Sequence, residues 1–189
     1  MRKILLICVS SVLLSACLGG RSPDSKFFML ESDANIVVSD KKTSVLVEMI
    51  SIPDLIYRPQ IVLKDKDSAE ILISEYNRWA EPLPDVIRQT LTDDLQTYLP
   101  NAFIKLAGYT TDKSKYQYIL KVEVNHFIGT FNDKAVLDVW WYLKNKNGVT
   151  VVREKTRLEL PLNDTYQDYV VVQSNLVSEL AKQIATKIN

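Results

Sequence analysis

The sequence predicts an α/β fold of the α+β-like kind, a single mixed, largely antiparallel sheet packed by two amphipathic helices. Three observations lead to this prediction. Strand-like segments outnumber helical ones, several of them alternate between apolar and polar residues, and two longer segments repeat apolar residues at helical spacing. Two such helices can cover one face of an antiparallel sheet.

The first half of the chain contains four strand-like segments. Residues 26–32 (KFFMLES) form a short apolar run, and residues 43–53 form a longer β-branched run that Pro53 ends. Residues 60–65 and 69–75 flank the charged turn DKDS, so they predict a β-hairpin.

Residues 81–100 predict the first helix, which is followed by a short strand over residues 103–106. Pro84 fits the first helical turn, Asp85 complements the positive helix end, and Pro100 marks the stop. The apolar residues at helical spacing are Leu83, Val86, Ile87, Leu91, Leu95, Tyr98 and Leu99.

The second half predicts a meander of three long strands. Even positions are apolar over residues 116–124, and odd positions are apolar over residues 135–143, which is the period of a half-buried strand. Trp141 therefore belongs to the core, and Trp140 points to the opposite face. Asn147-Gly148 predicts a two-residue hairpin turn, because both positions tolerate positive φ.

The chain ends in a second predicted helix. Thr165 and Asp168 have the spacing of a capping box. The apolar face that follows consists of Tyr169, Val172, Leu176, Val177, Leu180, Ala181, Ile184 and Ile188.

The N-terminus has the layout of a bacterial lipoprotein signal. Arg2 and Lys3 precede an apolar run, and LSAC at residues 14–17 resembles a lipobox. We therefore expect residues 1–16 to be a signal peptide, residues 17–26 to be an acylated cysteine with a flexible tether, and residues 27–189 to form one periplasmic α/β domain. The alternative is an ordinary secretory signal with an incidental cysteine.

Cys17 is the expected site of lipid attachment. Since Cys8 leaves with the signal, no thiol remains for a disulfide in the mature chain. Two or three acyl chains anchor a protein almost permanently. Leu18 stands where lipoproteins retained in the inner membrane tend to have Asp, so by resemblance we expect the outer membrane, facing the periplasm. The tether reaches roughly 30 Å at ~3.3–3.6 Å per residue.

Composition and motifs argue against several classes of function. Without Arg2 and Lys3 the chain has 21 basic and 23 acidic residues, unlike a nucleic-acid binder. Its single histidine, His126, is a poor start for a metal site or a catalytic triad. No G-x-S-x-G elbow and no glycine-rich phosphate loop occurs. The sequence therefore predicts a protein that is not an enzyme and has no cofactor.

Two short segments resemble a known family. Residues 57–62 read YRPQIV and residues 78–83 read RWAEPL. With an early FFML strand, a tryptophan-bearing late strand and a terminal helix rich in Ala and Leu, they are similar to the ABC-type transport auxiliary lipoproteins, the PqiC-like family of paraquat-inducible protein C. The resemblance covers nearly the whole mature chain, although Phe27-Phe28 stands where relatives often have tyrosines.

The resemblance implies a non-enzymatic part of a system that moves phospholipid or other hydrophobic cargo between membranes. Such lipoproteins act with a periplasmic MCE-domain protein and its inner-membrane partner, and the resemblance implies docking at the outer membrane as a ring-like homo-oligomer. The residues to which it assigns a structural or interface role are Tyr57, Arg58, Pro59, Gln60, Arg78, Trp79, Glu81 and Pro82.

Two alternatives stay open. Arg78 and Glu81 can instead form a local ion pair, and Trp79 can simply cover the core. The protein can also be a periplasmic lipid-binding carrier module that holds hydrophobic cargo in its own pocket, which requires a cavity of roughly 300–1,000 Å³. A carrier tied down by so short a tether would work poorly.

The lipobox makes the first testable prediction. Cys17→Ala removes the only expected acceptor of lipid, so we expect an unacylated protein that is absent from membrane fractions. Palmitate labelling and cell fractionation measure both properties. Persistent labelling of the variant would refute the assignment of Cys17.

Overall fold

The computed structural model describes residues 22–188, and within this range eight strands form one mixed, open sheet accompanied by two helices. The α+β fold class predicted from the sequence is confirmed. The elements in chain order are β1 (Lys26–Phe28), β2 (Ser44–Val47), β3 (Gln60–Lys64), β4 (Ile71–Trp79), α2 (Leu83–Tyr98), β5 (Phe103–Leu106), the 3-10 turn η1 (Lys113–Lys115), β6 (Tyr118–Gly129), β7 (Asp133–Asn145), β8 (Thr150–Leu162) and α3 (Tyr166–Lys187).

Strand β6 organises the sheet. One edge of it carries the long antiparallel meander β6–β7–β8. The other edge is shared, because β2 pairs with the start of β6 and β3 meets its end, both in parallel. The predicted β3–β4 hairpin is antiparallel, while β1 joins β4 and β5 joins β2 in parallel. The long ladders are therefore antiparallel, and short parallel pairings join the remaining strands to them.

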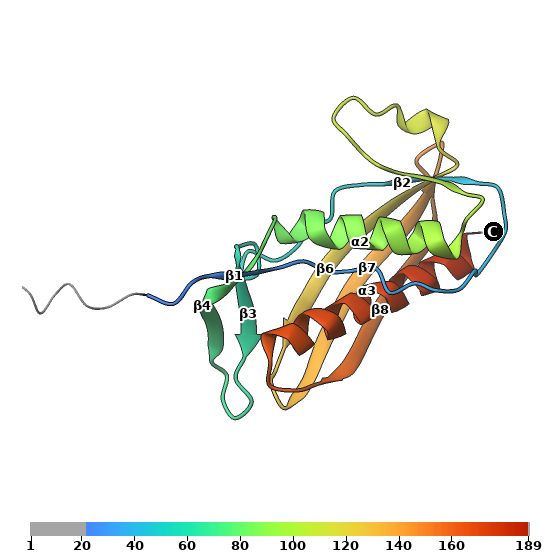
Figure 1. The fold of residues 1–189 in the computed structure, drawn as a ribbon. Coiled ribbons are helices and arrows are strands. Elements are labelled where there is room, and N and C mark those ends of the chain that lie inside the picture. Colours follow the sequence, from blue (N-terminus) through green and yellow to red (C-terminus); the bar gives the residue numbers. More distant parts are fainter. Residues whose placement is uncertain (1–21, 189) are drawn as a thin grey trace, which may run out of the picture.

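Both helices lie on the same side of the sheet, next to each other, as Figure 1 shows for α2 and α3 in front of β6, β7 and β8. The predicted apolar faces supply the core between helices and sheet, where Leu91, Leu95, Val177 and Ile184 are completely buried. Thr165 caps α3 as expected, since its Oγ1 accepts the N–H of Asp168 at 3.0 Å.

The adjacent tryptophans of β7 point to opposite faces, as predicted. Trp141 is completely buried, and its Nε1–H donates to Thr156 Oγ1 at 3.0 Å. Trp140 is partly exposed, and the guanidinium carbon of Arg153 lies 4.7 Å from its ring centroid. The tryptophan pair therefore contributes one core residue and one residue of the sheet face away from the core.

Two details of the meander differ from the sequence prediction. A β-bulge between Val124 and His126 shifts the alternation by one residue, so that Phe127 is buried at an odd position. The predicted two-residue turn at Asn147-Gly148 is wrong. Gly148 N–H donates to the carbonyl of Asn145 at 2.8 Å, and of these two positions only Gly148 has positive φ, at 78°. The loop is thus a three-residue turn ending in a bulged glycine.

Residues 29–40 form an extended strap over the two helices, where the sequence predicted that the first strand continues to residue 32. Leu30 is buried, and the N–H of Glu31 donates to Ser174 Oγ of α3 at 3.1 Å. Further along, Val38 N–H donates to the carbonyl of Tyr98 in α2 at 2.8 Å. The strap leaves the sheet after Phe28 because these helix groups take over its hydrogen bonding.

The strap is also held by Asp94, a completely buried carboxylate of α2. Its Oδ1 accepts hydrogen bonds from the hydroxyl of Ser32 and from the N–H of Ala34, whereas Oδ2 has no hydrogen-bond partner in the described part of the chain. Burial raises the pKa of this carboxyl, although the bonds from Ser32 and Ala34 oppose the shift.

The raised pKa of Asp94 predicts a dependence of stability on pH. A carboxyl that binds its proton more tightly in the fold favours the folded state at low pH and loses that contribution as pH rises through its folded-state pKa. Asp94→Asn has no carboxyl to deprotonate, so it does not lose stability in this way. The free energy of unfolding of the variant relative to the wild type should therefore increase from about pH 4 to pH 7. Urea unfolding at several pH values measures it, and parallel profiles would contradict the prediction.

The close packing around Gly129, at the junction of β6, β3 and α3, predicts that a larger residue does not fit at this position. It pairs with Leu63, and a Cβ there would lie 2.7 Å from Leu162 Cδ2 and from Tyr169 Cδ2. Gly129→Ala should therefore lower the free energy of unfolding by about 1–3 kcal/mol, the usual cost of overpacking.

Gly108→Ala is the matched control, because its Cβ would meet only Thr111 Oγ1 at 3.6 Å. Its effect should stay within about 0.5 kcal/mol. Equal denaturation midpoints for the two variants would show that the contacts around Gly129 leave room for a side chain.

Candidate functional site

The two sequence segments singled out above meet in space. Gln60 pairs with Arg78, and Trp79 N–H donates to the carbonyl of Pro59 at 2.7 Å. Together the segments surround a hollow of about 320 Å³, which we name the motif hollow. Its lining residues are Tyr57, Arg58, Pro59, Trp79, Ala80, Glu81, Pro82, Leu83 and Pro84.

A tight turn before β3 shapes one wall of the motif hollow. The N–H groups of Ile56 and Tyr57 donate to the carbonyl of Pro53, and Arg58 N–H donates to the carbonyl of Ile56 at 2.9 Å. The turn buries Ile56 in the core and leaves Tyr57 63% exposed at the rim. Burial of Ile56 thus fixes the backbone from which Tyr57 projects into solvent.

Trp79 contributes to the hollow from the core side. It is only 3% exposed, and its ring centroid lies 6.3 Å from that of Phe127 and 6.2 Å from that of Tyr169. Aromatic pairs at such distances add to the stability gained from burial. Trp79 therefore covers the core and lines the hollow at once.

Arg58 brings an unpaired donor to the motif hollow. Its Nε is buried and has no hydrogen-bond partner among the residues described. Leaving a buried donor unsatisfied is unfavourable for the fold. Glu81, on the opposite segment, is exposed.

Two candidate residues do not line the hollow. Gln60 and Arg78 occupy paired strand positions next to the lining, and the Nε and Nη2 groups of Arg78 donate to the carbonyl of Glu75, each at 3.3 Å. The ion pair between Arg78 and Glu81 considered from the sequence is not formed between these two described residues. Since Trp79 faces the core, strand alternation directs Arg78 to the other side.

Sequence reasoning missed part of the lining. Ala80, Leu83 and Pro84 belong to it, and Pro84 was interpreted only as a helix-start residue. The signal that could have identified them is position, because Ala80 and Leu83 lie within the RWAEPL segment and Pro84 directly follows it.

The motif hollow lies beside β1, the first strand of the described chain. Phe28 of β1 is in register with Trp79, and its carbonyl accepts the N–H of Ala80 at 2.9 Å. Cys17 and Leu18, the expected lipidation and sorting residues, lie outside the described residues. The chain that follows them enters the fold at the hollow.

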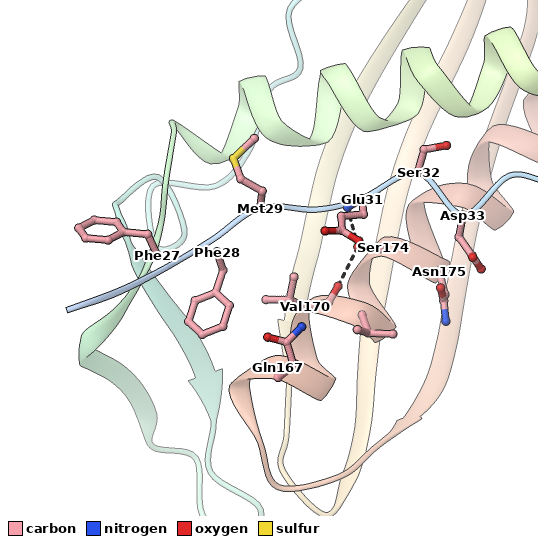
Figure 2. A pocket seen from close by; sticks show the side chains of 11 residues that line it. Phe27, Phe28, Met29, Glu31, Ser32, Asp33, Gln167, Val170, Ser174 and Asn175 are labelled. Atoms are coloured by element: carbon pink, nitrogen blue, oxygen red, sulfur yellow. Dashed lines mark hydrogen bonds between the residues drawn. The ribbon is translucent and has the colours of Figure 1, made fainter. Parts of the chain in front are cut away.

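A second hollow, of about 370 Å³, lies between the strap and α3 (Figure 2). Phe28 and Val170 form apolar parts of its wall, whereas Glu31 and Gln167 contribute polar groups. This mixed lining differs from that of the motif hollow, in which aromatic and proline residues predominate.

His126 is the single histidine of the chain. His126 is exposed on β6, directly after the bulge. Within residues 22–188, no group of three or more His, Cys, Asp or Glu residues is placed to hold a metal ion. No helix in this range is long and apolar enough to cross a membrane.

Comparison with known families decides the relationship of the chain. The family model described as the ABC-type transport auxiliary lipoprotein component matches residues 29–185. The chain belongs to this family. The resemblance noted in the sequence is confirmed, and it includes both segments of the motif hollow.

Individual relatives agree with this membership. The chain is 25% identical over 186 residues to the intermembrane transport lipoprotein PqiC of Escherichia coli K12, covering 97% of this chain and 96% of the relative. PqiC of Shigella flexneri matches with the same identity and coverage.

Solved structures show the same fold. The crystal structure of an uncharacterized protein has a TM-score of 0.73 at 24% identity and covers 88% of this chain and 100% of its own. A Xanthomonas campestris protein has a TM-score of 0.69 at 12% identity, covering 86% and 94%. The arrangement described here is therefore a fold found in proteins with distant sequences.

Proposed function

We propose that this transport auxiliary lipoprotein is anchored in the outer membrane and docks a periplasmic MCE-domain protein of an intermembrane phospholipid transport system. The observation that carries the proposal is the convergence of two distant segments on one mainly apolar hollow, beside the strand that leads to Cys17. The protein contributes binding and position to the system, without chemistry of its own.

The groups of the motif hollow suit a protein partner. Tyrosine, tryptophan and arginine are the residue types enriched among interface hot spots. Tyr57 is exposed, Trp79 is rigidly packed, and Arg58 lines the hollow. Prolines at the rim, such as Pro59 and Pro82, limit backbone freedom, which reduces the entropy lost on binding.

The size of the motif hollow favours side chains over lipid. Its volume of about 320 Å³ lies at the low end of the range for small-molecule pockets. One or two partner side chains fill such a space, whereas the two acyl chains of a phospholipid need more. A carrier that holds cargo in its own pocket is the second candidate, supported by the apolar lining of the hollow.

Membrane location and assembly complete the proposal. The relatives from Escherichia coli and Shigella flexneri are named intermembrane transport lipoproteins. For this chain we propose acylation at Cys17, sorting to the outer membrane through Leu18, a periplasmic orientation and a ring-like homo-oligomer. The MCE-domain protein would then connect the lipoprotein to an inner-membrane partner.

Substitutions at the motif hollow test the docking role. Tyr57→Ala and Arg58→Ala should each weaken binding of the MCE-domain protein at least about tenfold, since each removes an expected hot-spot group. Biolayer interferometry with the immobilised lipoprotein measures the affinity, and thermal unfolding checks that both variants remain folded.

Tyr109→Ala is the control, because Tyr109 is fully exposed and contributes nothing to the motif hollow. Its affinity should equal that of the wild type. Wild-type affinity in all three variants would refute docking at the hollow. Phospholipid that copurifies with the wild type but not with Tyr57→Ala would support the carrier instead.

A further inference from the structure

Large apolar side chains are exposed where the N-terminal tether enters the fold. Phe27 is 65% exposed, Met29 is 40% exposed, and Val171 of α3 is 48% exposed. All three border the second hollow, and Figure 2 shows Phe27 and Met29 projecting away from the side on which Phe28 lies. We name Phe27 and Met29 the tether-end patch.

The folding of the chain does not require this exposure. Phe28 and Leu30 already attach the segment to the core, and the β1–β4 ladder holds it through backbone hydrogen bonds. Phe27 is in register with Arg78, which points away from the core. The side chains of Phe27 and Met29 are thus exposed to solvent, although Phe28 and Leu30, which alternate with them along the chain, pack against the core.

The expected lipid anchor limits how far this patch can be from a bilayer. Phe27 follows Cys17 by ten residues. At ~3.3–3.6 Å per residue, even a fully extended chain would keep Phe27 within roughly 35 Å of the acylated sulfur. The patch is therefore the exposed apolar part of the fold closest along the chain to the anchor.

Charge does not explain the patch as an electrostatic contact. Lys26 and Arg78 are basic neighbours, whereas Asp24 and Glu31 are acidic neighbours at the same end. These charges nearly cancel, so attraction to anionic headgroups contributes little. Apolar burial is the remaining source of affinity, and the long side chain of Lys26 can keep its charge at the headgroup level beside it.

We propose that the tether-end patch rests on the bilayer that holds the acyl chains of Cys17, with Phe27 and Met29 at the level of the lipid headgroups. The contact rests on the proposed lipid anchor but not on docking at the motif hollow. The contact would fix the orientation of the folded domain relative to the membrane, so that the domain does not rotate freely on its tether. The motif hollow, one strand away, is then held close to the membrane surface.

The mature chain has no cysteine besides Cys17, so a second cysteine can be labelled selectively. Full-length acylated Phe27→Cys would carry an environment-sensitive fluorophore in vesicles of phosphatidylethanolamine and phosphatidylglycerol that contain nitroxide-labelled lipid. Phe103→Cys is the matched control, since Phe103 is 61% exposed and lies beyond the far end of α2. That helix alone spans about 24 Å at 1.5 Å per residue.

We expect at least about twofold stronger nitroxide quenching at position 27 than at position 103. Equal quenching in protein that floats with the vesicles would overturn the contact and leave the anchor intact. Protein that fails to float would overturn the anchor and the contact together. If quenching at position 27 disappears when the protein oligomerises, the patch contacts a second copy of the chain and not the bilayer.

Discussion

The packing of Trp79 against Phe127 and Tyr169 is the constraint on which the rest of this structure depends. The three rings come from the end of β4, the end of β6 and the start of α3, so one contact fixes three elements. Gly129 makes room for it, because any side chain there would collide with Tyr169. The position of Trp79 in turn sets the shape of the motif hollow, which has its indole as part of the lining.

The same junction links the proposed binding site to the proposed membrane anchor. Strand β1, which follows the tether, pairs with β4 at Trp79, and α2 begins four residues later at Leu83. The hollow therefore lies where the chain that follows the proposed anchor enters the sheet, between the turn before β3 and the start of α2. A partner bound there would be held at a distance from the membrane that is limited by the short tether.

Local patterns predicted most of the fold, whereas single inserted residues and long-range contacts account for what they missed. Period-two alternation located β6, β7 and β8, and apolar spacing located α2 and α3. The bulge at Asn125 and the turn closed by Gly148 depend on single inserted residues that interrupt such patterns. The strap after Phe28 has the sequence pattern of a strand, but its N–H groups donate to side chains and carbonyls of the helices. The resemblance identified the site segments, while their meeting in space required the β3–β4 register.

Hydrogen–deuterium exchange of the anchored lipoprotein, with and without the MCE-domain protein, tests the central claim most directly. The account predicts that the partner protects the amides of Tyr57, Arg58, Ala80, Glu81 and Leu83, which line the motif hollow. The outer edge of β8 should exchange equally in both samples. Protection confined to other surfaces, with unchanged exchange around the motif hollow, would contradict the account.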